Sequence, residues 1–227
     1  MKILALDTST DACSVALLND QQIIEEFTIV PQKHSQLILT MIDKILAQGE
    51  YSLTQIDAIA FGRGPGSFTG IRIAASVVQA LAFGLDLPVI PISTLHALAQ
   101  GATREFNALS VMAMIDARMN EVYWATYQCN EKGIMHTVIK EAIDKPEKIN
   151  LAKHQAPVTV IGSGWLVYET ILLSHYKKQI KEGYPYLPHA YDIAYLAKNA
   201  VNPIDYVKPE DALPLYLRND VVQAPTR

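Results

Sequence analysis

The stretch from residue 61 to residue 83 constrains the fold of this 227-residue chain more than any other segment does. It begins with a glycine-rich turn over residues 62–70, which directly follows the apolar run 56–61. It continues as a helix-compatible segment over residues 71–84. An apolar strand, a glycine turn and a helix in this order are typical of α/β domains. The sequence therefore predicts a strand–turn–helix unit here.

A glycine turn in front of a helix N-terminus can bind phosphate, so two nucleotide-binding patterns have to be compared with it. The Walker pattern fails because the turn contains no lysine. The dinucleotide fingerprint nearly matches in glycine spacing, but Asp86 precedes the next strand, whereas the ribose-binding acid belongs at a strand's far end. A structural or partner-facing loop is the better interpretation, with Ser67 and Thr69 as helix caps. The loop residues are Gly64, Pro65, Gly66, Ser67, Thr69 and Gly70.

The predicted helix over residues 71–84 is apolar in nearly every direction. Its polar residues Arg72, Ser76 and Gln79 are spaced by four and three, which places them in one narrow stripe. A helix that is apolar all round is buried on more than one side. Two interpretations remain open: the second side packs on another subunit, or the helix is clamped within its own domain.

A second predicted helix, over residues 35–48, carries a strong apolar stripe. The spacings of three and four place six apolar side chains on one face. These residues are Leu37, Ile38, Met41, Ile42, Ile45 and Leu46. His34, at the start of this helix, has no partner at metal-ligand spacing, so we interpret it as a cap or packing residue.

Strands and helices alternate along the whole chain, which predicts three-layer α/β domains. Strands are predicted over residues 2–6, 15–18, 22–28, 56–61, 88–92, 108–115, 121–128 and 158–161, and further helices over 94–100, 165–180 and 192–200. The hairpin over 108–128 echoes the N-terminal hairpin, as a duplicated fold requires. The short polar stretch 103–107 is the predicted boundary between an N-terminal subdomain, 1–103, and a smaller C-terminal subdomain with a tail, 104–227.

The first strand ends in Asp7, followed by a Thr/Ser turn and a hairpin. This opening resembles that of the actin-like ATPase and sugar-kinase superfamily, in which the acid helps to hold magnesium and the turn receives phosphate. Here the turn lacks the usual glycine, so we favour a structural role in which Asp7 and Thr8 bond backbone amides. The alternative is a vestigial nucleotide turn, made of Asp7, Thr8, Ser9, Gly162 and Gly164.

The composition gives no bulk signal for nucleic acid, since half of the residues are hydrophobic and the net charge is −4. The two cysteines, Cys13 and Cys129, stand apart and are interpreted as thiols of a reducing compartment. The N-terminal apolar stretch is too short for a signal sequence, and no apolar run is expected to approach a membrane span. A cytoplasmic location without membrane contact is therefore predicted.

Several motifs of this chain resemble the TsaB (YeaZ) family. The signature GPGSFTGIRIA stands at residues 64–74, with Ile71 and Ala74 at variable places. Further similar segments are ILALDTST at 3–10, CSVAL at 13–17, DARMNEVY at 116–123 and PLYLR at 214–218. Asn120 departs from the glycine that is more usual there. The resemblance reaches from residue 3 to residue 218, and it implies two tandem actin-like subdomains with mixed sheets flanked by helices.

The resemblance implies a non-catalytic subunit of the complex that makes threonylcarbamoyladenosine in tRNA. In the related catalytic subunit an HxxxH motif binds metal, and its histidines align with Thr94 and Leu98, which cannot replace them. We therefore expect no metal site and no cofactor on this chain alone, with ATP or ADP and metal in partner subunits. The implied partners are a TsaD-type catalytic subunit and a TsaE-type ATPase. The implied contact with tRNA is made only through the complex, and the lone chain is expected to form a homodimer.

The expected partner interface lies on the two apolar helices. Its residues are Leu37, Ile38, Met41, Ile42, Ile45, Arg72, Ser76, Val77, Ala80 and Leu81. Two other functions are weighed against it. One is a stand-alone ATPase or kinase that uses Asp7 and the Gly162 turn for nucleotide, and the other is a peptidase built on Ser67 and His96.

Overall fold

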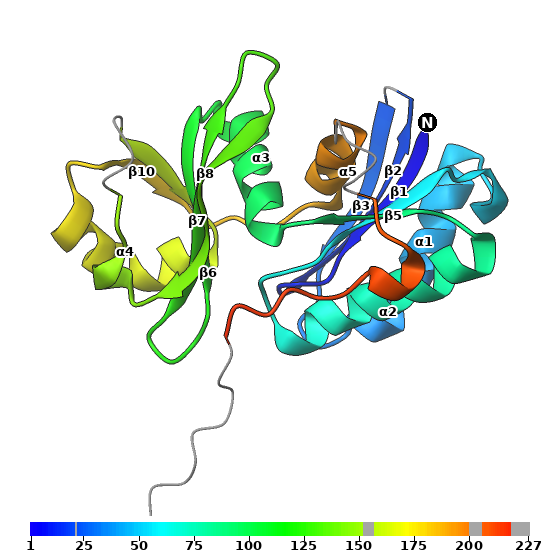
Figure 1. The fold of residues 1–227 in the computed structure, drawn as a ribbon, viewed down its shortest axis with the longest axis horizontal. Helices are drawn as coiled ribbons and strands as arrows, with labels where there is room; N and C mark the ends of the chain where they lie inside the picture. The colour runs from blue at the N-terminus through cyan, green and yellow to red at the C-terminus, as the bar shows by residue number, and fades with distance from the viewer. Residues whose placement is uncertain (21, 152–156, 200–205, 219–227) are drawn as a thin grey trace, which may run out of the picture.

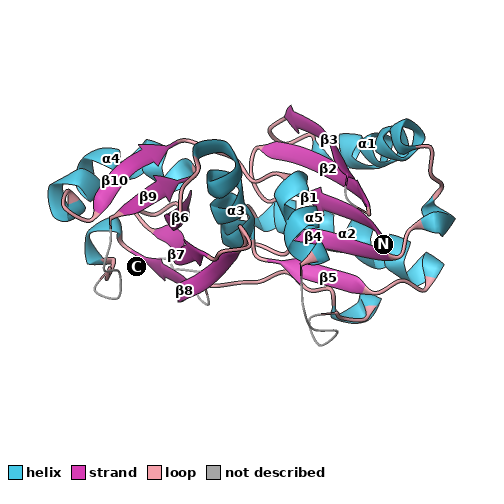
Figure 2. Ribbon diagram, turned by 90° about the horizontal axis from the view of Figure 1, so that it is seen from above, coloured by secondary structure: helices cyan, strands magenta, loops and turns pink. Residues whose placement is uncertain are grey.

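The computed structural model describes residues 1–20, 22–151, 157–199 and 206–218. It contains two five-stranded sheets that lie side by side, with helices between them and on their outer faces (Figures 1 and 2). Residue 200 of the helix predicted over 192–200 and the last nine residues of the predicted C-terminal subdomain lie outside the described residues.

The first sheet has the strand order β3-β2-β1-β4-β5. Its strands are β1 (Lys2–Asp7), β2 (Ala12–Asn19), β3 (Gln22–Ile29), β4 (Ala58–Gly62) and β5 (Val89–Ile92). The first three strands form an antiparallel meander, and β4 and β5 continue the sheet in parallel with β1. The central strands β1 and β4 are buried on both faces, which explains their continuous apolar sequences.

The second sheet repeats this order as β10-β9-β6-β7-β8. Its strands are β6 (Ser110–Asp116), β7 (Val122–Cys129), β8 (Met135–Asp144), β9 (Val158–Ile161) and β10 (Ile180–Tyr184). Strand β6 takes the place of β1, and both strands end in an aspartate. The predicted duplication is confirmed. The sequence missed β8 and β10, because they are edge strands whose charged side chains hide the apolar pattern.

Five α-helices cover the described sheets in layers (Figure 1). They are α1 (His34–Gly49), α2 (Phe68–Leu85), α3 (Thr94–Phe106), α4 (Ser163–Tyr176) and α5 (Ala190–Lys198), with 3₁₀ turns at Leu53–Gln55, Pro146–Lys148 and Pro209–Asp211. Helices α1 and α2 cover the outer face of the first sheet, and α5 covers its inner face. Helix α3 packs on the inner face of the second sheet, and α4 packs on its outer face.

The division between the two halves differs from the predicted one. The predicted boundary at residues 103–107 falls on the last turn of α3, so it is helix rather than linker. Helix α3 packs with the second sheet, whereas α5 comes from the C-terminal part of the chain and packs on the first sheet. The segment 206–218 also returns to the first sheet, where Val207 pairs with Val89. The two subdomains therefore exchange elements.

Helix α2 overturns the expectation that no apolar run approaches a membrane span. Of the helices that the structure describes, it alone passes a test of length and composition, with 18 residues and a mean hydropathy of 1.5. Only 33% of that window is buried. Its buried face, which includes Ala74, Val78 and Ala82, packs on the first sheet. The side of α2 that faces away from the sheet exposes Phe68, Ala80 and Phe83 beside the polar Arg72 and Ser76.

Candidate functional site: a groove between two helices

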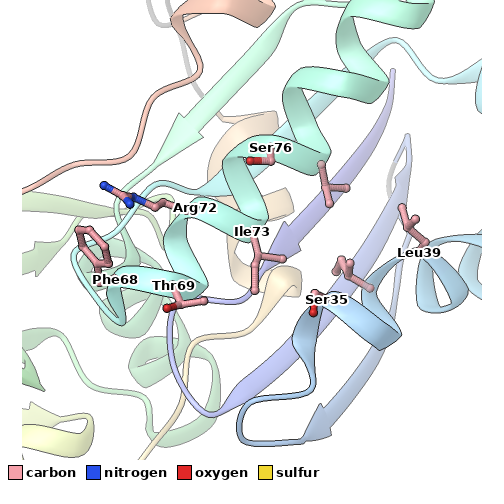
Figure 3. Close-up of a pocket in the computed structure, with 9 residues that line it drawn as sticks. Ser35, Leu39, Phe68, Thr69, Arg72, Ile73 and Ser76 are labelled. Atoms are coloured by element: carbon pink, nitrogen blue, oxygen red, sulfur yellow. The ribbon is translucent and has the colours of Figure 1, made fainter.

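A groove of about 430 Å³ lies between α1 and α2 on the outer face of the first subdomain (Figure 3). Ser35 and Leu39 of α1 face Ile73 of α2 across it. The residues that line it are Ser35, Ile38, Leu39, Phe68, Thr69, Arg72, Ile73, Ser76 and Val77. Arg72 is the single charged residue among them, so the groove is apolar with one cation at its end.

The predicted interface residues of α1 are mostly core residues, which corrects the prediction. Ile38, Met41, Ile42 and Ile45 pack on the first sheet in the main core of the subdomain. Leu37 is half-buried. The large apolar residue of α1 that is exposed is Leu39, at 56% exposure, which lies off the apolar stripe and was missed for that reason.

The predicted interface residues of α2 are largely at the surface. Arg72, Ser76 and Ala80 are exposed, and Val77 and Leu81 are half-buried. The structure adds two aromatic residues that the prediction did not include. Phe68 is 50% exposed at the start of α2, and Phe83 is 81% exposed near its end.

The glycine-rich loop is fastened to the turn that follows β1. The Ser67 amide donates to the Ser9 carbonyl at 2.7 Å, and the Thr8 hydroxyl donates to the Gly70 carbonyl at 2.7 Å. The Ser67 hydroxyl caps α2 by accepting from the Gly70 amide at 3.4 Å, as predicted. Thr69 does not cap the helix, because it lies within its exposed first turn.

Two glycines of this loop allow a contact that leaves no room for a phosphate. A Cβ on Gly70 would lie 2.0 Å from the Thr8 carbonyl oxygen, and one on Gly66 would lie 2.4 Å from that of Ser9. The loop backbone therefore packs directly on the turn, with carbonyl oxygens facing it. The residues present at this turn do not fit a phosphate group, which carries negative charge and needs amide donors.

Asp7 is completely buried beneath this contact. Its Oδ1 accepts hydrogen bonds from the Ser9 amide at 2.8 Å and the Ser9 hydroxyl at 2.7 Å, and its Oδ2 has no partner among the described residues. Burial raises the pKa of Asp7 to about 7, although the bonds from Ser9 and the nearby His189 lower it. The predicted bond from Asp7 to a backbone amide is confirmed, whereas Thr8 bonds a carbonyl instead.

The second predicted turn, Gly162 to Gly164, is also a close-packed corner. Gly162 has φ of +112°, and a Cβ there would lie 2.1 Å from the Met114 carbonyl oxygen. The Ser163 hydroxyl accepts from the Asp116 amide at 3.1 Å. These glycines bring the start of α4 against the end of β6.

A larger cleft of about 990 Å³ separates the two subdomains. The glycine-rich loop lines one wall, and the turn 116–119 and the start of α4 line the other. The charged groups of this second wall are already paired, since Arg118 lies 3.1 Å from Asp116. The cleft brings together both predicted nucleotide turns, but each turn is closed by its own packing.

The residues weighed for catalysis do not form a reactive constellation. Thr94 and Leu98 are fully buried. The His96 Nε2 lies 2.7 Å from the Met135 carbonyl oxygen, and its ring stacks on Tyr127 with centroids 5.0 Å apart. Burial lowers the pKa of His96. His96 is therefore held by the second subdomain rather than by Ser67. Across the residues that the structure describes, no group of three His, Cys, Asp or Glu side chains could hold a metal ion.

Comparisons with known proteins place the chain in a family. Residues 18–224 match the family model described as TsaD: tRNA N6-adenosine threonylcarbamoyltransferase. The Escherichia coli (strain K12) protein named tRNA threonylcarbamoyladenosine biosynthesis protein TsaB is 45% identical over 223 residues, which cover 97% of this chain and 96% of that one. The chain belongs to the TsaB (YeaZ) family. A TsaB protein of Haemophilus influenzae is 40% identical, over 97% of this chain and 95% of its own length.

A solved structure described as YeaZ from Pseudomonas aeruginosa superposes with a TM-score of 0.87 at 42% identity, over 95% of this chain and 99% of that one. A second structure from the same organism, described as an uncharacterized protein with similarity to peptidase YEAZ, gives a TM-score of 0.88 at 43% identity, over 96% of this chain and 99% of that one. The resemblance and the fold class predicted from the sequence are confirmed. Because a TsaD model matches a TsaB-family chain, the two families share this duplicated fold.

Proposed function

We propose that this chain is a non-catalytic subunit for threonylcarbamoyladenosine synthesis in tRNA, and that it binds a TsaD-type catalytic subunit through the α1/α2 groove. The observation that carries the proposal is the groove between α1 and α2, where apolar side chains of both helices remain accessible. Together with Leu39 of α1, helix α2 presents Phe68, Ile73 and Val77 around a groove with one charge. Contiguous exposed apolar surface of this kind marks an interaction site.

A TsaD-type partner fits this groove because it shares the fold. Because a TsaD family model matches residues 18–224 of this chain, we expect a TsaD-type subunit to carry a similar helix pair on the outer face of its first sheet. Two helix pairs can pack ridges into grooves, which buries apolar surface on both sides. The same face can pack on a second copy of this chain, so we expect a homodimer of the lone chain to use the groove as well.

The chemistry is assigned to the other subunits. ATP or ADP and metal bind to the TsaD-type subunit and a TsaE-type ATPase, and tRNA is engaged through the assembled complex in the cytoplasm. Two observations favour this division: Thr94 and Leu98 offer no ligand where the related subunit has histidines, and the Asp7 turn is closed by the glycine-rich loop.

An omission experiment tests the proposal. Purified TsaD-type and TsaE-type subunits, tRNA, ATP and threonylcarbamoyl adenylate are combined with and without this chain, and modified adenosine is measured by mass spectrometry. We expect modification only when the chain is present, and none from the chain alone. Turnover by the chain alone that disappears in an Asp7→Ala variant would overturn the proposal in favour of an enzyme.

A further inference from the structure

Arg72 lies beside two aromatic rings at the end of the groove. Its guanidinium carbon lies 3.7 Å from the centroid of the Phe68 ring and 5.6 Å from that of Tyr216. Its Nε donates a hydrogen bond to the Tyr216 hydroxyl at 2.8 Å. Figure 3 shows the Arg72 side chain extended toward Phe68, at the N-terminal end of α2. The cation is therefore held by stacking and by one directed hydrogen bond.

Tyr216 is itself fixed, because the segment that carries it is fastened to α2 and to the glycine-rich loop. The Gln79 side-chain amide donates to the Ala212 carbonyl at 3.3 Å, and the Leu215 amide donates to the Arg63 carbonyl at 2.8 Å. The C-terminal segment lies across α2 in Figure 1 (orange to red). Arg72 is thus oriented before any partner arrives, which lowers the entropy cost of using it in binding.

The binding capacity of Arg72 is largely unused. Its Nε is engaged with the Tyr216 hydroxyl, and among the described residues the structure shows no further hydrogen bond and no ion pair of Arg72. A guanidinium presents a planar fork that matches a carboxylate with two parallel hydrogen bonds. Stacked and hydrogen-bonded on one edge, Arg72 leaves its other donors to face outward.

We propose that Arg72 is a preorganised carboxylate receptor, and that the partner helix carries an aspartate or glutamate, flanked by apolar residues, that binds it. This inference rests on the proposed function and adds the chemical feature that the partner must present. The groove supplies apolar contact without directional preference, whereas a buried arginine–carboxylate pair fixes the register of the two helix pairs. Arginine is one of the residue types enriched among the hot spots of protein interfaces.

A protein carboxylate fits Arg72 better than an RNA phosphate does. Binding to a nucleic-acid backbone requires several cations along one path. The groove has one cation, and the chain carries a net charge of −4. In the neighbouring cleft Arg118 is paired with Asp116, and Arg218 is paired with Glu121. Arg72 therefore stands alone among apolar groups, which is the setting of a single protein ion pair.

The test uses titration calorimetry of the full chain with the TsaD-type subunit at low and moderate salt. Arg72→Lys keeps the charge and loses the fork, and Tyr216→Phe removes only the hydrogen bond to Nε. Arg118→Lys is the matched control, because it makes the same replacement on an exposed arginine outside the groove. We expect Arg72→Lys to weaken binding about 30-fold, Tyr216→Phe to weaken it about threefold through a lost hydrogen bond, and Arg118→Lys to have no effect. Melting by circular dichroism confirms that each variant is folded.

A second arm identifies the carboxylate. Each Asp or Glu on the partner's outer helix pair is replaced with its amide, and the variant that weakens binding is combined with Arg72→Lys. If the two residues contact each other directly, the losses do not add, so the double variant is expected to bind about as well as the weaker of the two single variants.

The outcomes separate the two proposals. If the wild-type chain does not bind the TsaD-type subunit, the proposed function is overturned and this inference with it. If Leu39→Asp abolishes binding while Arg72→Lys binds as tightly as wild type, the groove is supported as the interface and the proposal of a carboxylate receptor is wrong. If Arg72→Lys weakens binding to tRNA but not to the TsaD-type subunit, Arg72 recognises phosphate, and the proposal is overturned in favour of RNA contact.

Discussion

The cleft between the subdomains and the α1/α2 groove differ in what closes them. The cleft between the subdomains is the larger, at about 990 Å³, yet the glycine-rich loop packs directly on the Asp7 turn at its wall. The α1/α2 groove is smaller, at about 430 Å³, and Phe68 and Leu39 remain exposed beside it. The glycine-rich loop thus occupies the wall of the first site by its own packing, whereas no such packing covers Leu39 and Phe68 at the second. This difference is the reason why we propose the α1/α2 groove, rather than the Asp7 turn, as the binding site.

The largest expected effect comes from a charge in the groove. Leu39→Asp places a carboxylate where apolar surface is to be buried, and leaving a charge buried without a partner costs about 3–5 kcal/mol. Binding of the TsaD-type subunit should therefore fall by more than 100-fold, and any homodimer detected by light scattering should be lost as well. Leu109→Asp is the matched control, because Leu109 is 63% exposed on the second subdomain. Loss of the homodimer with normal partner binding would show that the two assemblies use different faces.

The buried Asp7 turn predicts that the free energy of unfolding depends on pH. Burial raises the pKa of Asp7 to about 7 from 3.8, so the folded protein holds this proton more tightly than the unfolded chain does. The stability that the proton contributes is present at low pH and is lost as the pH rises from about 4 to about 7. Asp7→Asn removes this titration. Between pH 5 and pH 8, the unfolding free energy of the wild type should fall relative to the variant by roughly 2–3 kcal/mol.

Urea denaturation of both proteins at several pH values measures this difference. A constant difference between the wild type and Asp7→Asn across that range would contradict the buried, protonated carboxyl. It would instead place Asp7 in contact with water, which would reopen the turn as a ligand site.

One added methyl group should disrupt the packing of the glycine-rich loop on the turn that follows β1. In Gly70→Ala the new Cβ would lie 2.0 Å from the Thr8 carbonyl oxygen, and overpacking of this kind costs about 1–3 kcal/mol. Gly84→Ala adds the same methyl to the same helix in open space, so it should be neutral or stabilising by up to about 1 kcal/mol. Thermal melting distinguishes the two variants. Equal melting temperatures would mean that the loop is not packed on the turn.

The smallest effect is expected at the cap of α2. Ser67→Ala removes the hydroxyl that accepts from the Gly70 amide, and loss of such a cap typically costs about 1 kcal/mol. The melting temperature should fall slightly, while the activity of the reconstituted complex stays intact. A folded Ser67→Ala variant with abolished activity would indicate chemistry at Ser67.

The sequence predicted the central strands and the edge strands β3 and β5, but it missed the edge strands of the second sheet. Central strands such as β1 and β4 are buried on both faces, so their apolar runs are continuous and easily recognised. The edge strands β8 and β10 mix charged and apolar side chains and were not recognised. The exchange of α3 and α5 between the sheets could not be predicted, because each helix pattern shows that a face is buried but not which sheet buries it.

The same limit applies to the candidate site. The stripe on α1 indicated a buried face, and the structure shows that its own sheet covers Ile38, Ile42 and Ile45. Leu39 interrupts the period, so it was not singled out. Arg72 was recognised as part of a polar stripe, but its hydrogen-bond partner Tyr216 is 144 residues away in the chain. Only the folded chain brings these two residues together.

Hydroxyl-radical footprinting of the complex tests the central claim most directly, because each hollow has an exposed leucine as a probe. Leu39 lines the groove at 56% exposure, and Leu166 lines the cleft at 69%. When the TsaD-type subunit is added, we predict that oxidation of Leu39 falls while oxidation of Leu166 stays unchanged. Protection of Leu166 with Leu39 still oxidised would contradict the account and place the partner in the cleft.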